Sequence, residues 1–264
     1  MTPLSQEWSL SEQHPLALAA LFCVGFLASS INAVAGGGSL LSFPLLIALG
    51  VPPLSANATN SVALWPGSLA SAFGFWDQLT RTKKQLPYLV PPTILGSLFG
   101  AWLLTHTPER LFNFVVPVLV LLATSLLGFQ KKIRALALGG KTKVPVSVGM
   151  ILQFLVAVYG GYFGAGMGII MLAVFGLFVE GTLHEHNALK AWLGVAINLV
   201  ASVFFLREGL LWLVPGFSMM AGAIAGGYFS ARLSQKVNPD KLRSAVVVLG
   251  ALMTTWFFWS AFKR

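Results

Sequence analysis

Two glycine-rich stretches contain the residues best suited to bind a ligand. The first reads Ala35-Gly36-Gly37-Gly38-Ser39, and the second runs from Gly160 to Gly168. Glycine runs interrupt helices, and a helix that begins just after one points its unpaired N–H groups and its positive dipole end at an anion. Close helix packing is the competing interpretation, because Gly160, Gly164 and Gly168 are spaced four apart.

Polar side chains follow each glycine stretch inside otherwise apolar sequence. Asn60 and Lys190 occupy matching places after the two stretches. The lysine is the unusual member, because a cation within an apolar span is costly and is usually functional. Two interpretations of Lys190 stay open, a ligand for an anion and a side chain that snorkels to the membrane interface. Asn57 and Asn187 suit either ligand binding or a helix N-cap.

These groups form one candidate substrate-binding set, to which Asn32 and Asn198 add neutral hydrogen-bond donors. The set is Asn32, Gly36, Gly37, Gly38, Ser39, Asn57, Thr59, Asn60, Gly166, Gly168, Asn187, Lys190 and Asn198.

We expect no catalytic residue, metal or cofactor. His184-Glu185-His186 resembles a metal cluster only superficially, because two histidines two apart lie on opposite sides of a helix. We expect that segment to be a solvated loop. The sequence has one cysteine, Cys23, and neither an HExxH nor a GxxxxGK[ST] motif. An enzyme and an ATP-driven pump are therefore disfavoured.

The composition shows what kind of protein must position these residues. The 264 residues include only 17 Lys or Arg and 8 Asp or Glu, while 56% are hydrophobic and the mean hydropathy is +0.79. A soluble domain uses about 25% charged residues, so a cytosolic globular enzyme and a disordered regulator are excluded. The single cysteine excludes a disulfide scaffold. The net charge of +9 indicates basic cytoplasmic loops and needs no nucleic acid.

The distribution of charge predicts how the chain crosses the membrane. Two apolar blocks, 15–50 and 145–178, are too long for one span, and each contains a glycine stretch. Basic residues fall mainly in three loops, at 81–84, 131–143 and 232–243. All three loops are cytoplasmic, and the N-terminus is outside, if each long block goes in and returns as a full or re-entrant hairpin.

The chain also matches itself in order. Gly36-Gly37-Gly38 falls on Gly166-Met167-Gly168 and Asn57-Ala58 on Asn187-Ala188, and two further matches follow. Each copy has five segments, so the second must be upside down, a pattern typical of secondary transporters.

We therefore predict an all-α integral membrane protein of two inverted-topology repeats. Each repeat has five helical segments and opens with a broken glycine-rich hairpin, which gives eight to ten membrane segments in all. The expected organisation is an extracytoplasmic tail at 1–14, a first repeat at 15–129, a basic cytoplasmic linker at 130–144 and a second repeat at 145–262.

The glycine hairpins resemble those of the TauE/SafE family, also called the toluene-sulfonate uptake permease family. The resemblance rests on segment 32–44, on Gly50-Val51-Pro52-Pro53 with segment 56–61, and on segment 160–168 with Asn187-Ala188 and Asn198. It covers residues 15–262, with Met167 and Val174 as departures in the second copy. The resemblance implies transport of sulfite, sulfonate or related anions across a cell membrane.

The leading hypothesis is a secondary transporter in the cell inner membrane, passing through it several times. It moves a small sulfur-containing anion by alternating access, coupled to an ion or proton gradient. An anion channel on the same scaffold and a carboxylate carrier are the alternatives. The expected partners are a small anionic substrate and membrane lipid, without nucleic acid, and a homodimer is left open.

Overall fold

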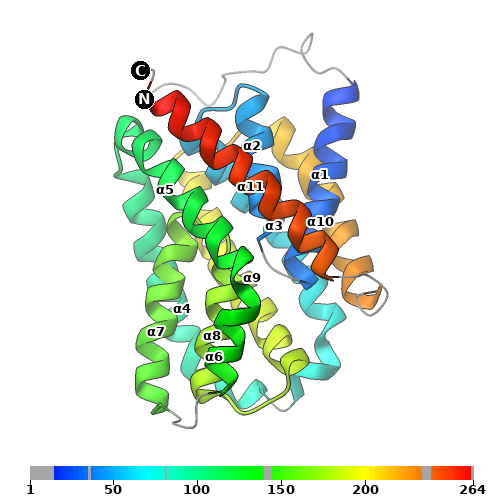
Figure 1. Cartoon of the computed structure of the whole chain (residues 1–264), viewed down its shortest axis with the longest axis vertical. Helices are drawn as coiled ribbons and strands as arrows, with labels where there is room; N and C mark the ends of the chain where they lie inside the picture. Colours follow the sequence, from blue (N-terminus) through cyan, green and yellow to red (C-terminus); the bar gives the residue numbers. More distant parts are fainter. Residues whose placement is uncertain (1–14, 35–36, 81, 140–143, 234–238, 263–264) are drawn as a thin grey trace.

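The protein is almost entirely helical (Figure 1). The computed structural model describes residues 15–34, 37–80, 82–139, 144–233 and 239–262. Within these residues 88% are helical and none forms a strand. The predicted all-α class is confirmed.

The described residues of the first half form five α-helices. They are α1 (Pro15–Val34), α2 (Ser39–Ala48), α3 (Pro53–Gly74), α4 (Leu86–Thr105) and α5 (Glu109–Gly128). Two short 3-10 helices, η2 (Trp76–Thr80) and η3 (Lys83–Gln85), connect α3 to α4. The exposed basic residues Lys83 and Lys84 lie in η3.

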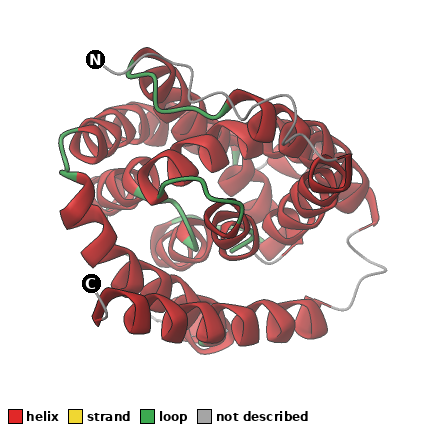
Figure 2. Ribbon diagram, turned by 90° about the horizontal axis from the view of Figure 1, so that it is seen from above, coloured by secondary structure: helices red, strands yellow, loops and turns green. Residues whose placement is uncertain are grey.

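A short linking helix separates these helices from those of the second half. Helix α6 (Gln130–Gly139) occupies most of the segment expected to be a basic linker. The helices that follow it are α7 (Val146–Tyr162), α8 (Met167–Phe178), α9 (Leu183–Arg207), α10 (Leu213–Leu233) and α11 (Pro239–Phe262). In Figure 2 α11, which ends at the C-terminus, runs along one edge of the bundle.

The second arm of each glycine hairpin is short. Helix α2 has 10 residues and α8 has 12. At 1.5 Å per residue these helices are about 15 and 18 Å long, whereas a hydrocarbon core is about 30 Å thick. Neither helix can cross a bilayer alone, which favours re-entrant hairpins over full ones. In Figure 1 α2 lies in the upper part of the molecule and α8 in the lower part.

In the described part of the chain, four helical stretches are long and apolar enough to cross a membrane. These are Pro15–Ala33, Lys83–Thr105, Glu109–Gly128 and His184–Arg207. The chain is therefore an integral membrane protein. The full number of spans and the inverted relation of the two halves stay predictions.

The two halves share one interior. Helix α1 packs mainly on α10, and α4 packs mainly on α7. Glycines permit both approaches: a Cβ atom on Gly100 would lie 2.1 Å from the Val158 carbonyl oxygen, and one on Gly222 would lie 1.9 Å from that of Phe22. The interpretation of Gly96, Gly100, Gly222 and Gly226 as packing residues is consistent with these contacts.

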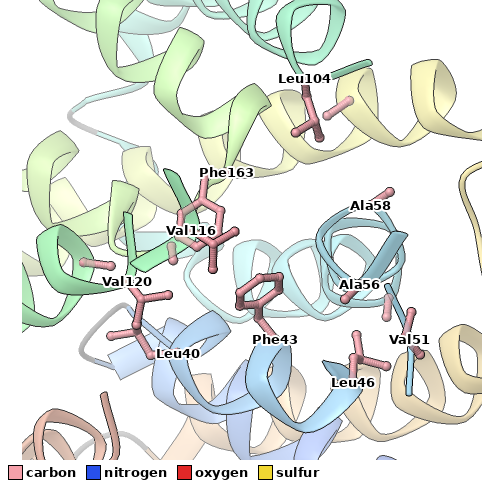
Figure 3. Packing of buried hydrophobic residues seen from close by; sticks show 14 of the residues in the cluster. Leu40, Phe43, Leu46, Val51, Ala56, Ala58, Leu104, Val116, Val120 and Phe163 are labelled. Carbon is pink, nitrogen blue, oxygen red and sulfur yellow. The ribbon is translucent and has the colours of Figure 1, made fainter. Parts of the chain in front are cut away.

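The hairpins meet each other inside the bundle. Phe43 of α2 and Phe163 of the second glycine tip pack edge to face, with ring centroids 5.3 Å apart. Figure 3 shows both rings among buried aliphatic side chains that include Leu40, Val116 and Val120. This apolar contact brings the two helix breaks to one place.

Candidate functional site

Each glycine tip turns through backbone that other residues rarely adopt. The φ angle is +87° at Gly37, +76° at Gly164 and +77° at Gly166. Glycine reaches this left-handed region without the steric cost that a Cβ brings. The turn itself therefore accounts for these three glycines, and a packing stripe alone does not. Gly38 differs, because its φ is −59° and a Cβ there would lie 1.9 Å from the carbonyl oxygen of Ala28.

A side chain from the first arm holds each tip. Asn32 Oδ1 accepts a hydrogen bond from the N–H of Gly38 at 2.7 Å. In the second hairpin the Tyr159 hydroxyl donates to the carbonyl oxygen of Ala165 at 2.5 Å. Both bonds span six residues. The two breaks are thus closed in a similar way by different chemical groups.

Each half also ties down the hairpin of the other half. Asn57 Nδ2 of α3 donates to the carbonyl oxygen of Tyr162 at the end of α7, at 2.8 Å. Lys190 Nζ of α9 donates to the carbonyl oxygen of Asn32 near the end of α1, at 3.3 Å. The last carbonyl groups of a helix have no partner within it. Side chains of the opposite half provide partners here.

A cavity of about 70 Å³ lies between the two tips. The tips contribute Gly37, Phe163, Gly164 and Gly166, and the first residues of the short helices, Ser39 and Met167, also line it. Since one water needs about 10–15 Å³ of such a cavity, the volume suits a guest of few heavy atoms.

The walls of the cavity come from the longer helices. α1 contributes Asn32, α3 contributes Asn60 and a row of serines, and α9 contributes Lys190 and Asn198. Asn60 Oδ1 accepts from the Ser42 hydroxyl at 2.5 Å. The amide NH₂ of Asn60 is therefore the group that can donate to a guest.

Lys190 is the charged residue among the described residues of the cavity lining. It is 7% exposed, and its stem passes Gly168, where a Cβ would lie 3.1 Å from Lys190 Cδ. A burial of this depth does not fit a side chain that snorkels to the interface. The absence of a side chain at Gly168 makes room for the lysine stem.

The structure brings together eight of the thirteen predicted site residues. The residues that line the cavity are Asn32, Gly37, Ser39, Asn60, Gly166, Gly168, Lys190 and Asn198. Gly38 is packed against the α1 backbone, and Gly36 lies outside the described residues. Binding by this set stays a prediction.

Three predicted residues stand apart from the cavity lining. Asn57 bonds to Tyr162, and Thr59 Oγ1 accepts from the N–H of Trp212 at 3.0 Å. Asn187 is buried, and its Oδ1 has no hydrogen-bond partner. The N-cap interpretation of Asn57 and Asn187 is wrong, because α3 is capped at Pro52 and α9 at Thr182.

The expected solvated loop at 184–186 is also wrong. These residues form the first turn of α9, in which Glu185 closes a capping box with Thr182. His186 is 2% exposed, and its Nε2 lies 3.1 Å from the Val179 carbonyl oxygen. Within the described residues no group of three His, Cys, Asp or Glu side chains is arranged to hold a metal ion.

Sequence reasoning missed three hydroxyl groups of the cavity. They belong to Ser29 of α1 and to Ser68 and Ser71 of α3, where Ser61 also lines the cavity. The signal was present, since Asn57, Ser61, Ser68 and Ser71 recur at helical spacing in an apolar span. Ser71 is 4% exposed, and its Oγ has no hydrogen-bond partner.

The fold and cavity define a helical membrane protein with a small polar site at two broken hairpins. The family profile described as "Sulfite exporter TauE/SafE" matches residues 21–257. The chain therefore belongs to the TauE/SafE family of membrane transporters.

Curated proteins that the chain resembles are named as probable membrane transporters. A probable membrane transporter protein of Haemophilus influenzae is 31% identical over 90% of this chain and 92% of its own. The probable membrane transporter protein YfcA of Escherichia coli K12 is 27% identical over 93% of this chain and 91% of its own. No solved structure matches the chain.

Proposed function

We propose that the chain is a secondary transporter that binds a small oxyanion between its two glycine tips. The observation that carries the proposal is the buried Lys190 in a cavity that the starts of α2 and α8 also line. An ammonium group, helix N-termini and amide donors form the set that stabilises an anion. The family's description names sulfite, so sulfite and sulfonates are the substrates to test first.

The contact between Lys190 and Asn32 provides a link between binding and movement. An anion in the cavity competes with the Asn32 carbonyl oxygen for the lysine ammonium. Drawing Lys190 away loosens the tie between α9 and the first hairpin. Such differential contacts are what a ligand needs to shift a protein from one conformation to another. The two halves then move against each other, so that the cavity opens in turn to each side of the membrane, as in other transporters with broken helices.

Flux into proteoliposomes tests the proposal. The purified protein is assayed for uptake and counterflow with sulfite, thiosulfate, methanesulfonate, taurine and small carboxylates. The protein is oriented as in the inner membrane, and proton or sodium gradients are imposed. We expect saturable counterflow of at least one anion by the wild type. Lys190→Gln should lose it, while Lys84→Gln, on the exposed face of η3, should keep it.

Two results would contradict the proposal. Absence of uptake, counterflow and binding for every anion would exclude an anion carrier. Single-channel currents without counterflow would favour the anion channel. A response confined to carboxylates would keep the carrier and replace the substrate class.

A further inference from the structure

We propose that the cavity selects anions that carry a single negative charge, and that Lys190 sets this limit. This inference rests on the proposed function. Of the described residues that line the cavity, Lys190 is the one that carries a charge, and the others are amides, hydroxyls, glycines and apolar side chains. The two tip residues outside the described part of the chain, Ala35 and Gly36, are neutral.

The helix dipoles add little net charge to this lysine. The positive ends of α2 and α8 reach the cavity, but α1 and α7 end at the same tips with their negative ends. A helix end carries about half an elementary charge, of opposite sign at its two ends. The paired arms therefore offset each other. The N–H groups of Met167 and Ile169, at the start of α8, are already bonded to the carbonyl oxygens of Gly164 and Gly166.

One ammonium group can neutralise one charge on a buried guest. A second negative charge in the same cavity would be desolvated without a counter-ion, and such burial is strongly unfavourable. Ser71 and Asn60 can donate hydrogen bonds to oxygens of the guest, but they add no charge. A monoanion is thus favoured over a dianion of similar shape.

The apolar part of the lining has room for a neutral substituent. Phe163 and Met171 are 3% and 0% exposed, and Leu64 and Met167 line the cavity beside them. Thioether and aromatic side chains suit an alkyl group. The preferred guest is an oxyanion with its oxygens toward Lys190 and a small uncharged group toward the methionines.

Methanesulfonate and sulfate give a matched test. Both are tetrahedral, and near neutral pH they differ by one charge, with a methyl group in place of an oxygen. Binding to the purified full chain is measured by calorimetry at equal ionic strength. We expect methanesulfonate to bind at least about tenfold more tightly, a difference of about 1.4 kcal/mol. Equal affinities, or tighter sulfate binding, would overturn the inference while leaving an anion site in place.

A second cation introduced into the cavity should shift the preference from the monoanion toward the dianion. Ser68 lines the cavity and is half-buried, so Ser68→Lys adds a charge there with less disruption than a change at the buried Asn60. We expect the preference to move toward sulfate by about tenfold or more, whereas Lys84→Gln leaves it unchanged. If neither anion binds the wild type, and no other member of the panel does, the proposed function fails instead.

Discussion

Lys190 Nζ donates a hydrogen bond to the backbone carbonyl oxygen of Asn32, 158 residues earlier in the chain, at 3.3 Å. The side chain of Asn32 meanwhile accepts from the N–H of Gly38. One asparagine therefore joins the end of α1, the start of α2 and the lysine of α9. A change in the position of Lys190 is transmitted to both arms of the first hairpin.

Space at Gly168 should control the position of Lys190. In Gly168→Ala the new Cβ would lie 3.1 Å from Lys190 Cδ, so we expect several-fold weaker anion binding with a small loss of stability. Gly194→Ala is the matched control, because this glycine also lines the cavity and its Cβ would lie 3.9 Å from Met167 Cε. Equal affinities of the two variants in calorimetry would contradict the role of Gly168.

Alanine substitutions at two glycines should distinguish the cost of backbone strain from the cost of a steric clash. Gly50 has a φ of +88° and open space around a Cβ, so Gly50→Ala should cost about 1–2 kcal/mol and still fold. In Gly38→Ala the Cβ meets the α1 backbone at 1.9 Å, and we expect the hairpin to fail to form. Detergent-stable yield and thermal unfolding measure both effects. Similar behaviour of the two variants would show that α1 and α2 can separate at little cost.

We expect Thr59 to contribute to the stability of the fold and not to anion binding. Thr59→Val keeps the shape but removes the acceptor for the N–H of Trp212, which should lower stability by about 1–2 kcal/mol. The cavity does not include Thr59, so anion affinity should stay within about twofold of wild type. Asn60→Ala, in the same helix but in the lining, should weaken binding. A loss of affinity in Thr59→Val would place this residue in the site.

We expect the unpartnered hydroxyl of Ser71 to donate a hydrogen bond to the bound anion. Ser71→Ala removes a buried group that has no bond to lose, so stability should stay the same or rise by about 1 kcal/mol. Anion affinity should fall by about two- to tenfold, the value of one neutral hydrogen bond. Ser202 also carries a buried hydroxyl without a partner, but it lies outside the lining, so Ser202→Ala should leave affinity unchanged. The same affinity in both variants would argue against Ser71.

Local sequence signals predicted the elements of this fold well. The glycine runs marked both helix breaks, because Gly37, Gly164 and Gly166 adopt angles that exclude most other residues. Lys190 could also be predicted, because a cation within an apolar span is costly and is usually functional. The length of the second arms could not be predicted, because charge counts alone do not distinguish a re-entrant helix from a crossing one.

Pairings between distant helices were beyond sequence reasoning. Asn57 looks like a cap or a ligand in the linear chain, and only the approach of α7 makes it the partner of Tyr162. His186 looked solvated, yet α9 begins earlier than expected, and its first turn is buried. Such roles depend on which helix lies opposite, and one sequence contains no direct record of that.

The interleaving of the two halves has a consequence for how the protein is made. Leu18 in α1 accepts a hydrogen bond from Ser218 in α10, 200 residues later. At about 5–20 residues per second, roughly 10–40 s of translation separate the two helices. During that interval the newborn α1 has entered the bilayer without its neighbour, and the surface around Gly25, which approaches Met219 of α10 in the folded protein, faces lipid or the insertion machinery. Ribosome-bound chains arrested before and after α10 should therefore crosslink differently at a cysteine introduced by Leu21→Cys, because Leu21 is fully buried in the folded protein.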